Sequence, residues 1–274
     1  MGAQAAARRA VLAPGSLDAA GLAATGERTA PGLPREEYWF ARHDAAYAWI
    51  GSRLGDFADL DPVAVDAGSG EGYGAQRLRD AGARAVVALE YDPAACAHGA
   101  GRYPSIATVR ANLAALPLAT ASADLVVSCQ VIEHLWALPD FLADCRRVLR
   151  PGGVLVVTTP NRLTFSPGLA RGAKPLNPFH VEEFDAGQVR DALARAGFVR
   201  IEVLGLHHGA RLRAWEEAHG SLVGAQVGAV LSGEWPAMLQ EMVSSVTLDD
   251  FAVSEHDVDS AEDLVGVAWT EASS

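Results

Sequence analysis

The chain has 274 residues, a length that fits one large domain with insertions better than two full domains. Half of its residues are hydrophobic and 20% are charged, as in an ordinary soluble globular protein, and its formal net charge of -12 argues against a nucleic-acid partner because a polyanion would be repelled. No apolar run approaches the roughly 18 residues of a membrane helix, and residues 1–24 lack the continuous apolar segment of a secretory signal, so we expect a cytoplasmic protein without a membrane partner.

The three cysteines are Cys96, Cys129 and Cys145, and no two of them form a C-x-x-C pair. An odd number without close pairs indicates buried, reduced thiols and does not suggest a zinc cluster. Reduced thiols agree with a cytoplasmic location.

The N-terminal part divides into a tail and a helix. Residues 1–25 are rich in Ala, Gly and Arg without clear periodicity, which predicts a mobile tail before a single folded domain at 26–274. Between residues 35 and 54, the spacing of Trp39, His43 and Tyr47 places aromatic side chains on one face of a helix. This helix either caps a ligand or packs on the edge of a sheet, and the sequence does not separate the two.

Strand and helix signals alternate after this first helix. The expected strands span residues 63–66, 85–90, 106–110, 124–128 and 154–159, and the expected helices span 73–82, 93–102 and 138–150. Such alternation implies a parallel sheet with right-handed crossovers, in which a ligand binds beyond the carboxyl ends of the strands.

The C-terminal part continues the pattern less regularly. A helix at 182–196 ends at Gly197, a good C-terminal signal, and leads into a strand at 199–204. Two further strand candidates lie at 251–254 and 264–269.

Residues 207–246 have mixed polarity and interrupt the sheet, so we expect a helical insertion over the pocket. The expected fold is α/β, with a doubly wound sheet of seven mostly parallel strands, an N-terminal cap helix and this insertion near the C-terminus. Substrate identity should lie in the insertions at 160–179 and 207–246.

The most informative segment is the turn after the first expected strand. The apolar run at 63–65 ends in Asp66 and then meets glycines at alternate positions. Gly68, Gly70 and Gly72 let the backbone approach a ligand closely where the strand turns into a helix, as at a nucleotide-like cofactor site. The dinucleotide fingerprint is G-x-G-x-x-G, whereas these glycines read G-x-G-x-G, so the spacing disfavours NAD.

The run from Asp66 to Gly72 resembles the first motif of the Rossmann-like S-adenosylmethionine-dependent methyltransferases. The resemblance implies a Rossmann-like fold in which this acid and the glycine turn hold the amino-acid end of the cofactor. Glu90 stands 24 residues after Asp66, close to the spacing at which an acid accepts the ribose hydroxyls, and the ring of Tyr91 can lie against adenine.

Further segments extend this resemblance over residues 63–160. After the third strand the family usually has an Asp that accepts from the adenine amino group, and here Asn112 takes its place, with an amide oxygen that can still accept. The segments at 124–135 and 147–153 resemble the family's fourth strand and the turn before its fifth. The resemblance implies that S-adenosylmethionine is bound by Asp66, Gly68, Ser69, Gly70, Gly72, Glu90, Tyr91, Asn112, Leu113 and Cys129.

Gln130, Glu133 and His134 lie at i, i+3 and i+4, which on a helix places them on one face, and His180 follows the fifth strand. The set is similar to the E-x-x-E-H plus distant His site with which plant small-RNA 2′-hydroxyl methyltransferases bind a divalent ion. Gln130 departs from that pattern, and a neutral ligand weakens a site for a hard cation such as magnesium.

Two roles follow for these side chains. The resemblance implies a metal site formed by Gln130, Glu133, His134 and His180 that would acidify the acceptor hydroxyl. Without a metal, His134 or His180 is the candidate general base, so the predicted catalytic residues are His134, His180 and Glu133. A purely structural role for His134 at a helix start also stays open.

Longer motifs suggest the acceptor. Segments at residues 26–29, 38–43, 71–75, 130–136, 159–168 and 177–180 resemble actinobacterial methyltransferases associated with methylglucose lipopolysaccharide synthesis. This resemblance implies O-methylation of a sugar or oligosaccharide in polysaccharide biosynthesis, with Trp136 and Trp215 available to stack on sugar faces.

Two alternatives to a sugar acceptor stay open. One is O-methylation of another small molecule, such as a phenolic or polyketide intermediate, which a deep apolar pocket under residues 207–246 would favour. The other is a non-catalytic protein that binds S-adenosylmethionine, which would be favoured if the insertion closed the methyl-transfer face. The sequence also leaves open whether the chain forms a homodimer.

Overall fold

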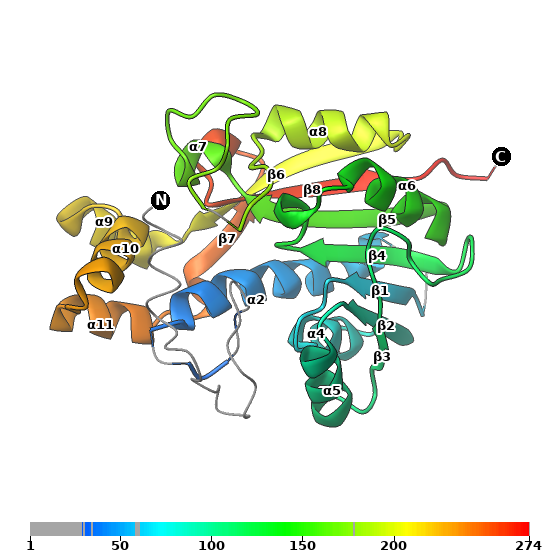
Figure 1. Cartoon of the computed structure of the whole chain (residues 1–274), viewed down its shortest axis with the longest axis horizontal. Coiled ribbons are helices and arrows are strands. Elements are labelled where there is room, and N and C mark those ends of the chain that lie inside the picture. The colour runs from blue at the N-terminus through cyan, green and yellow to red at the C-terminus, as the bar shows by residue number, and fades with distance from the viewer. Residues whose placement is uncertain (1–28, 30, 34, 58–60, 178, 274) are drawn as a thin grey trace.

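The computed structural model describes residues 29, 31–33, 35–57, 61–177 and 179–273, and the tail expected at 1–25 lies outside them. Helices flank both faces of one central sheet (Figure 1). Its strands are β1 (Val63–Ala67), β2 (Ala85–Glu90), β3 (Ala107–Arg110), β4 (Ala123–Cys129), β5 (Leu149–Pro160), β6 (Arg200–His208), β7 (Phe251–Ser254) and β8 (Asp263–Trp269). The strand order across the sheet is β3-β2-β1-β4-β5-β8-β6-β7.

The first five strands run parallel, as predicted, and β8 lies antiparallel between β5 and β6. The prediction of seven strands is wrong by one, because the described residues form a sheet of eight. Each of the eight segments expected as strands forms one, so the total of seven was one too low. β6 is longer than expected, because it continues past residue 204 and pairs residues 205–208 with β7 in antiparallel register, and β7 forms the outer edge beside it.

The remaining elements before the C-terminal region are α2 (Glu37–Ser52), α3 (Leu54–Phe57), α4 (Tyr73–Asp80), α5 (Pro93–Arg102), α6 (Leu138–Val148), α7 (Arg162–Phe165) and α8 (Ala186–Arg195). The last of these begins later than the expected residue 182 because Asp185 caps it. The Asp185 side chain accepts from the Gln188 amide at 3.0 Å, and the Gln188 side chain accepts from the Asp185 amide at 3.2 Å. Among the described residues, every helix is too short or too polar to cross a bilayer.

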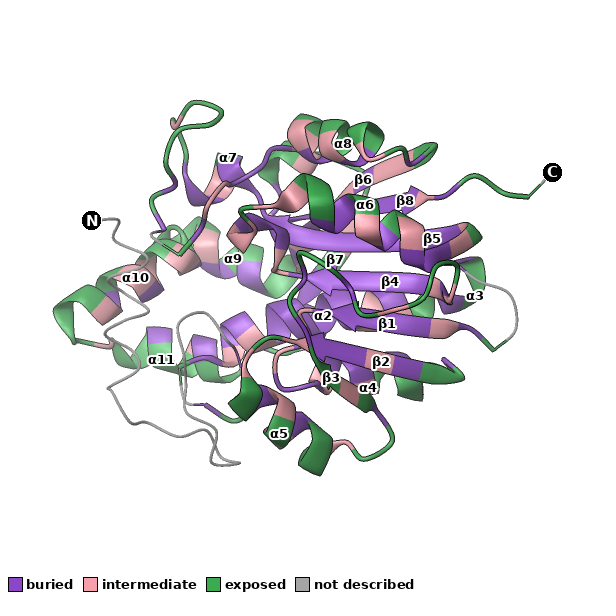
Figure 2. Cartoon of the chain, turned by 45° about the vertical axis from the view of Figure 1, so that its right-hand side comes forward, coloured by how far each residue is buried: buried purple, intermediate pink, exposed green. Residues whose placement is uncertain are grey.

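The sheet separates two hydrophobic cores, because successive strand residues point to opposite faces. In β4, Val126 packs in the core that contains Phe141 of α6, whereas Val127 packs with Tyr38 of α2 and Leu78 of α4. Figure 2 shows the central strands buried along most of their length, with exposed residues on the outer sides of the helices. Burial on both faces explains why the strand segments read as nearly continuous apolar runs.

The expected helical insertion lies between β6 and β7 and consists of α9 (Ala210–His219), α10 (Leu222–Ser232) and α11 (Ala237–Ser244). These helices lie beside the N-terminal part of α2 (Figure 1). Leu212, Trp215 and Leu222 belong to the same core as Tyr38, so the insertion packs on the first helix of the described chain.

Candidate active site

The turn between β1 and α4 depends on glycine. Gly68, Gly70 and Gly72 have φ of 87°, 56° and 96°, in the left-handed region that other residues rarely adopt. A Cβ atom on Gly68 would lie 2.5 Å from a methyl group of Val131, whereas one on Gly70 would project into open space. The turn therefore exposes bare backbone to an open volume.

A main cavity of about 410 Å³ adjoins this turn, within the roughly 300–1,000 Å³ typical of small-molecule sites. Of the residues predicted to bind the cofactor, Gly68, Ser69, Gly70, Glu90, Tyr91, Leu113 and Cys129 line it. Its wall also contains Thr29, His43, Tyr47, Glu71, Tyr73, Gln130, Val131, His134 and Phe179. The aromatic spacing of the first helix was the signal for His43 and Tyr47, and their place in the wall favours the first of the two alternatives left open for that helix.

Two polar side chains of the main cavity fit a nucleoside-like ligand. Ser69 Oγ is buried and has no hydrogen-bond partner among the described residues, so a polar ligand would satisfy it. Glu90 Oε2 accepts from the Gly70 amide at 2.9 Å, and its Oε1 accepts from the Tyr91 and Asp92 amides at 2.8 Å each. Because a carboxylate has about four lone-pair positions, one remains for a ligand hydroxyl.

Three predicted cofactor residues, Asp66, Gly72 and Asn112, are not part of the cavity wall. Asp66 is buried behind the turn, where its Oδ1 accepts from the Tyr47 hydroxyl at 2.8 Å. Burial raises the pKa of Asp66 to about 7, although the Tyr47 hydrogen bond opposes the shift. Asn112 is exposed, and its Oδ1 accepts from the Ala114 amide at 3.0 Å because a local turn forms within its own loop.

A second cavity, the side chamber, has a volume of about 50 Å³ and shares His43, Gln130 and His134 with the main cavity. The rest of its wall is Arg35, Glu36, Trp39, Arg42, Glu133, Pro160, Phe165, Asn177, His180, Gln226, Val227, Val230 and Trp235. The wall is formed by α2 and the two positions before it, the segment after β4, the end of β5, α7, the loop before α8 and the insertion. Two ligands, one in each cavity, would therefore meet at a common wall.

The segment that follows β4 is not the expected α-helix. Gln130 has a left-handed φ of 56°, and η1 (Ile132–His134) is a single turn of 3-10 helix. The helical spacing on which the predicted common face relied is therefore absent, although residues 130, 133 and 134 all line the side chamber. Gln130 Oε1 accepts from Arg42 Nη2 at 3.4 Å, and its Nε2 donates to Thr158 Oγ1 at 3.2 Å.

Glu133, His134 and His180 nevertheless come together, because one candidate ligand atom of each lies within 4.8 Å of the others. Glu133 is buried, and its Oε2 accepts from Thr159 Oγ1 at 3.1 Å. Its carbonyl oxygen accepts from the Val181 amide at 2.7 Å, which ties η1 to the loop that carries His180. One carboxylate and two imidazoles form a donor set that suits first-row transition cations better than magnesium.

The two histidine rings lie 5.1 Å apart, and their hydrogen bonds differ. His134 Nδ1 is 3.0 Å from the Phe179 carbonyl oxygen, which only accepts, so Nδ1 carries the proton and Nε2 carries the lone pair. His180 Nδ1 donates to Glu183 Oε1 at 2.8 Å, and its Nε2 accepts from Asn177 Nδ2 at 3.0 Å. His134, which lines both cavities, is therefore better oriented to take a proton.

Comparison with known proteins identifies the family. A model of the methyltransferase domain matches residues 65–157. A probable S-adenosylmethionine-dependent methyltransferase of Mycolicibacterium smegmatis is 47% identical over 252 residues, which cover 90% of this chain and 95% of the relative. The chain belongs to the S-adenosylmethionine-dependent methyltransferases. A probable methyltransferase of Mycobacterium tuberculosis is 46% identical over 253 residues, which cover 90% of this chain and 89% of the relative.

The fold of this methyltransferase is also found among solved structures. A protein of Thermotoga maritima described as a possible histamine N-methyltransferase matches with a TM-score of 0.57 at 16% identity, covering 86% of this chain and 94% of that chain. At this identity the likeness concerns the fold alone. The sequence relatives, by contrast, make S-adenosylmethionine the methyl donor of this enzyme.

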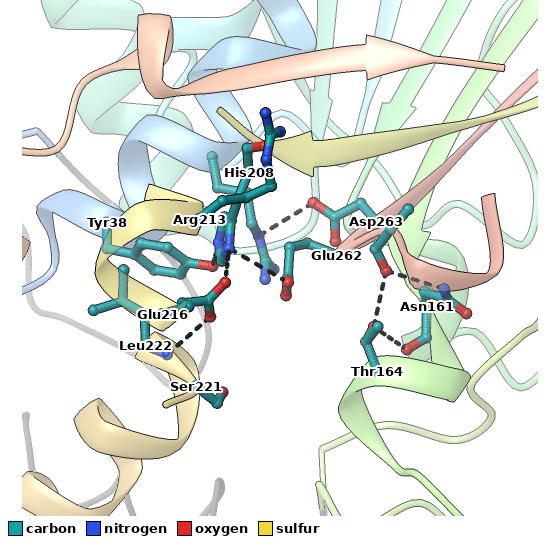
Figure 3. A network of polar contacts seen from close by, with 12 residues as sticks. Tyr38, Asn161, Thr164, His208, Arg213, Glu216, Ser221, Leu222, Glu262 and Asp263 are labelled. Carbon is teal, nitrogen blue, oxygen red and sulfur yellow. Dashed lines mark hydrogen bonds and ion pairs between the residues drawn. The ribbon is translucent and has the colours of Figure 1, made fainter. Parts of the chain in front are cut away.

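A partly buried chain of hydrogen bonds connects the insertion of the methyltransferase to its core (Figure 3). Glu216 of α9 accepts from the Leu222 amide through Oε1 and from His208 Nδ1 through Oε2, both at 2.9 Å. His208 Nε2 accepts from the Tyr38 hydroxyl at 2.7 Å. Burial alone would raise the pKa of Glu216, but the hydrogen bonds from His208 and the Leu222 amide hold it below its ordinary value. The start of α10 is thereby connected to β6 and α2.

Replacing Glu216 with alanine should lower the free energy of unfolding by about 1–3 kcal/mol, because it removes the acceptor of the Leu222 amide and leaves His208 Nδ1 with the more distant carboxylate of Glu262, at 3.7 Å. The melting temperature should fall by roughly 2–4 °C per kcal/mol for a domain of this size. Thermal unfolding followed by circular dichroism at pH 7 measures the change, and Glu217→Ala on the exposed side of α9 is the matched control.

The pH dependence gives a second check on Glu216. Because its folded-state pKa is lowered, the stabilisation is present at neutral pH and is lost as the pH falls below the ordinary range of a glutamate. The gap between wild type and Glu216→Ala should therefore narrow in acid. A gap that stays constant down to pH 3 would contradict the role of the carboxylate.

The two tryptophans expected to stack on a sugar have different environments. Trp215 is 8% exposed and packs in the core, so it is not available to a ligand. Trp136 is 89% exposed and lies outside the walls of both cavities. The aromatic residues that line the side chamber are Trp39, Phe165 and Trp235 instead.

Proposed function

We propose that this methyltransferase transfers the methyl group of S-adenosylmethionine to a hydroxyl of a sugar or oligosaccharide. The observation that carries the proposal is the wall common to both cavities, because His43, Gln130 and His134 line each of them. A hydroxyl in the side chamber would then lie beside a methyl donor in the main cavity.

The donor fits the main cavity through residues of the first two strand ends. The turn from Gly68 to Gly72 would hold the amino-acid end, with Ser69 Oγ bonding to it. Glu90 has one lone-pair position for a ribose hydroxyl, and Tyr91, which is 66% exposed, can lie against adenine. Asp66 lies behind the turn and would position Tyr47, which lines the cavity, without contacting the donor itself.

Methyl transfer to oxygen is an in-line displacement in which the O–C bond forms as the C–S bond breaks, and the acceptor must lose its proton. Full deprotonation of an aliphatic hydroxyl by a histidine in advance would cost roughly 12 kcal/mol, from pKa values near 15.7 and 6.5. The proton therefore leaves during the transfer, and His134 Nε2 is the proposed acceptor. The products are the methyl ether, S-adenosylhomocysteine and a protonated His134.

A metal-assisted version uses the same side chains. Glu133, His134 and His180 would hold a divalent cation, whose charge would lower the pKa of a nearby hydroxyl. One nitrogen of His180 would have to give up its present hydrogen bond to Asn177 or Glu183 to do so. Gln130 bonds to Arg42 and Thr158 and is left out of this donor set. Chelation with EDTA followed by addition of magnesium or manganese separates the versions. If activity survives chelation and Glu133→Ala is as active as wild type, the metal-assisted version is wrong and the version with proton transfer to His134 stands.

The lining of the side chamber supports a sugar. It combines aromatic rings of Trp39 and Trp235 with the polar side chains of Arg42, Asn177 and Gln226, a mixture suited to a ring that has apolar faces and a rim of hydroxyls. The chamber is also narrow, and the apolar side chains of Val227 and Val230 line it. These two features favour a second candidate function, O-methylation of a small phenolic or other non-sugar compound. A volume of about 50 Å³ admits the reactive edge of an acceptor instead of a whole oligosaccharide.

Radiolabelled S-adenosylmethionine tests the proposal directly. Purified protein should label maltotetraose, taken as a glucose oligosaccharide, more efficiently than catechol, taken as a phenolic acceptor. Labelling of catechol without labelling of maltotetraose would show that the acceptor is a phenolic compound and not a sugar. Binding of S-adenosylmethionine with no transfer to either probe or to an oligosaccharide extract would favour the non-catalytic binding protein.

A further inference from the structure

Gln226 and Arg42, which are 2% and 1% exposed, line the side chamber, and each has a buried side-chain atom without a hydrogen-bond partner among the described residues. These atoms are Gln226 Oε1 and Arg42 Nη1. An amide oxygen only accepts and a guanidinium nitrogen only donates, so the two atoms need opposite partners. Buried polar atoms normally have a partner, and a ligand in the chamber would supply both.

Gln226 is held in place by its own helix. Its Nε2 donates to the Leu222 carbonyl oxygen at 3.3 Å, which leaves Oε1 as the atom without a bond. The start of α10 is itself fixed, because Glu216 accepts from the Leu222 amide (Figure 3) and Ser221 Oγ accepts from the Gly224 amide at 3.0 Å. The amide oxygen is therefore positioned before a ligand arrives.

Arg42 is held in place by contacts of its own. Its Nε lies 3.1 Å from Asp263 Oδ2, and its Nη2 donates to Gln130 Oε1. The guanidinium carbon lies 5.0 Å from the ring centre of Trp39 and 4.9 Å from that of Phe165. Burial alone would lower the pKa of Arg42, but the carboxylate of Asp263 helps to raise it overall, so the group stays charged. Nη1 is the atom left to bond to a ligand.

We propose that Gln226 Oε1 and Arg42 Nη1 bind the acceptor through a hydroxyl other than the one that is methylated, an inference that rests on the proposed function. A hydroxyl can donate to Gln226 and accept from Arg42, whereas a carboxylate can pair with Arg42 but has no proton for Gln226. The methylated hydroxyl must lie near His134, so the acceptor carries at least two hydroxyls. The pair therefore selects a polyol over a compound with a single hydroxyl.

Replacing Gln226 with methionine tests this directly, since the variant keeps the side-chain length and lacks the amide oxygen. With maltotetraose as acceptor, KM should rise roughly tenfold or more, while the Kd for S-adenosylmethionine measured without acceptor stays unchanged. The melting temperature of the ligand-free variant should rise by roughly 2–4 °C, because an unsatisfied atom is no longer buried. Gln240→Met on the exposed side of α11 is the matched control and should change none of these values.

The outcomes separate this inference from the proposed function. If wild type methylates maltotetraose and Gln226→Met has the same KM, the inference is wrong and the sugar methyltransferase stands. If wild type methylates phenol, which has one hydroxyl, and leaves maltotetraose unmodified, the proposed function fails and the polyol selection fails with it. An increase in KM for maltotetraose together with a higher melting temperature supports the inference, because a purely structural role would lower stability.

Discussion

Replacing His134 with alanine should lower kcat by roughly 10²–10⁴-fold, the usual contribution of a positioned general base. The ring is the candidate base that lines both cavities, and its Nδ1 is held by the Phe179 carbonyl so that Nε2 carries the lone pair. Binding of S-adenosylmethionine should change little, because the glycine turn and Glu90 are untouched. Single-turnover transfer of the labelled methyl group and isothermal titration of the cofactor measure the two effects separately.

Restoring the activity of the His134→Ala variant with added imidazole distinguishes a proton acceptor at position 134 from a structural residue. Imidazole added to His134→Ala should restore part of the activity, since the truncated side chain leaves room for it beside the side chamber. The matched control is His256→Ala, an exposed histidine outside both cavities, which should keep wild-type kcat. Unchanged kcat in His134→Ala would rule out both the base and the metal ligand at this position.

The donor side of the site could be predicted from local sequence. Left-handed φ strongly favours glycine, so the alternate glycines at residues 68–72 predict the geometry of the turn. Glu90 and Tyr91 follow from their place at the end of the second strand, because carboxyl ends of parallel strands meet at one edge of the sheet. These segments do line the main cavity.

The acceptor side depends on contacts between residues far apart in the chain, and local patterns do not encode them. Gln130 reads as the first residue of a helical face, yet Arg42 and Thr158 hold its side chain while its backbone is left-handed. Residues 251–254 were expected as a strand, but their pairing with the end of β6 is also non-local, since three α-helices lie between the two strands in the chain. The side chamber likewise has a non-local origin, because Gln226 of α10 and Arg42 of α2 line the same cavity although they lie far apart in the chain.

Replacing Asp66 with asparagine should stabilise the ligand-free protein at pH 8 and leave its stability nearly unchanged at pH 4. Burial raises the pKa of Asp66 from its ordinary value of 3.8 to about 7, with a smaller contribution from the charge of Glu90. A folded-state pKa above the unfolded one means that the carboxyl's contribution is fully present below about pH 4 and is lost as the pH rises through about 7. Asparagine never ionises, and its amide oxygen can still accept from Tyr47.

The folded-state pKa of Asp66 lies about three units above its ordinary value, which corresponds to a free energy of unfolding lower by on the order of 4 kcal/mol at pH 8. The asparagine variant should therefore melt on the order of 10 °C above wild type at that pH. S-adenosylmethionine carries a positive sulfonium, so its binding in the adjacent main cavity should favour the ionised carboxylate and shrink this difference. Melting curves of both proteins from pH 4 to pH 8, with and without the cofactor, measure the effect. If the melting temperatures of the two proteins follow parallel curves over this pH range, Asp66 keeps an ordinary pKa. Its carboxyl must then contact solvent or ligand, which would place it in the wall of the cavity and not behind the turn.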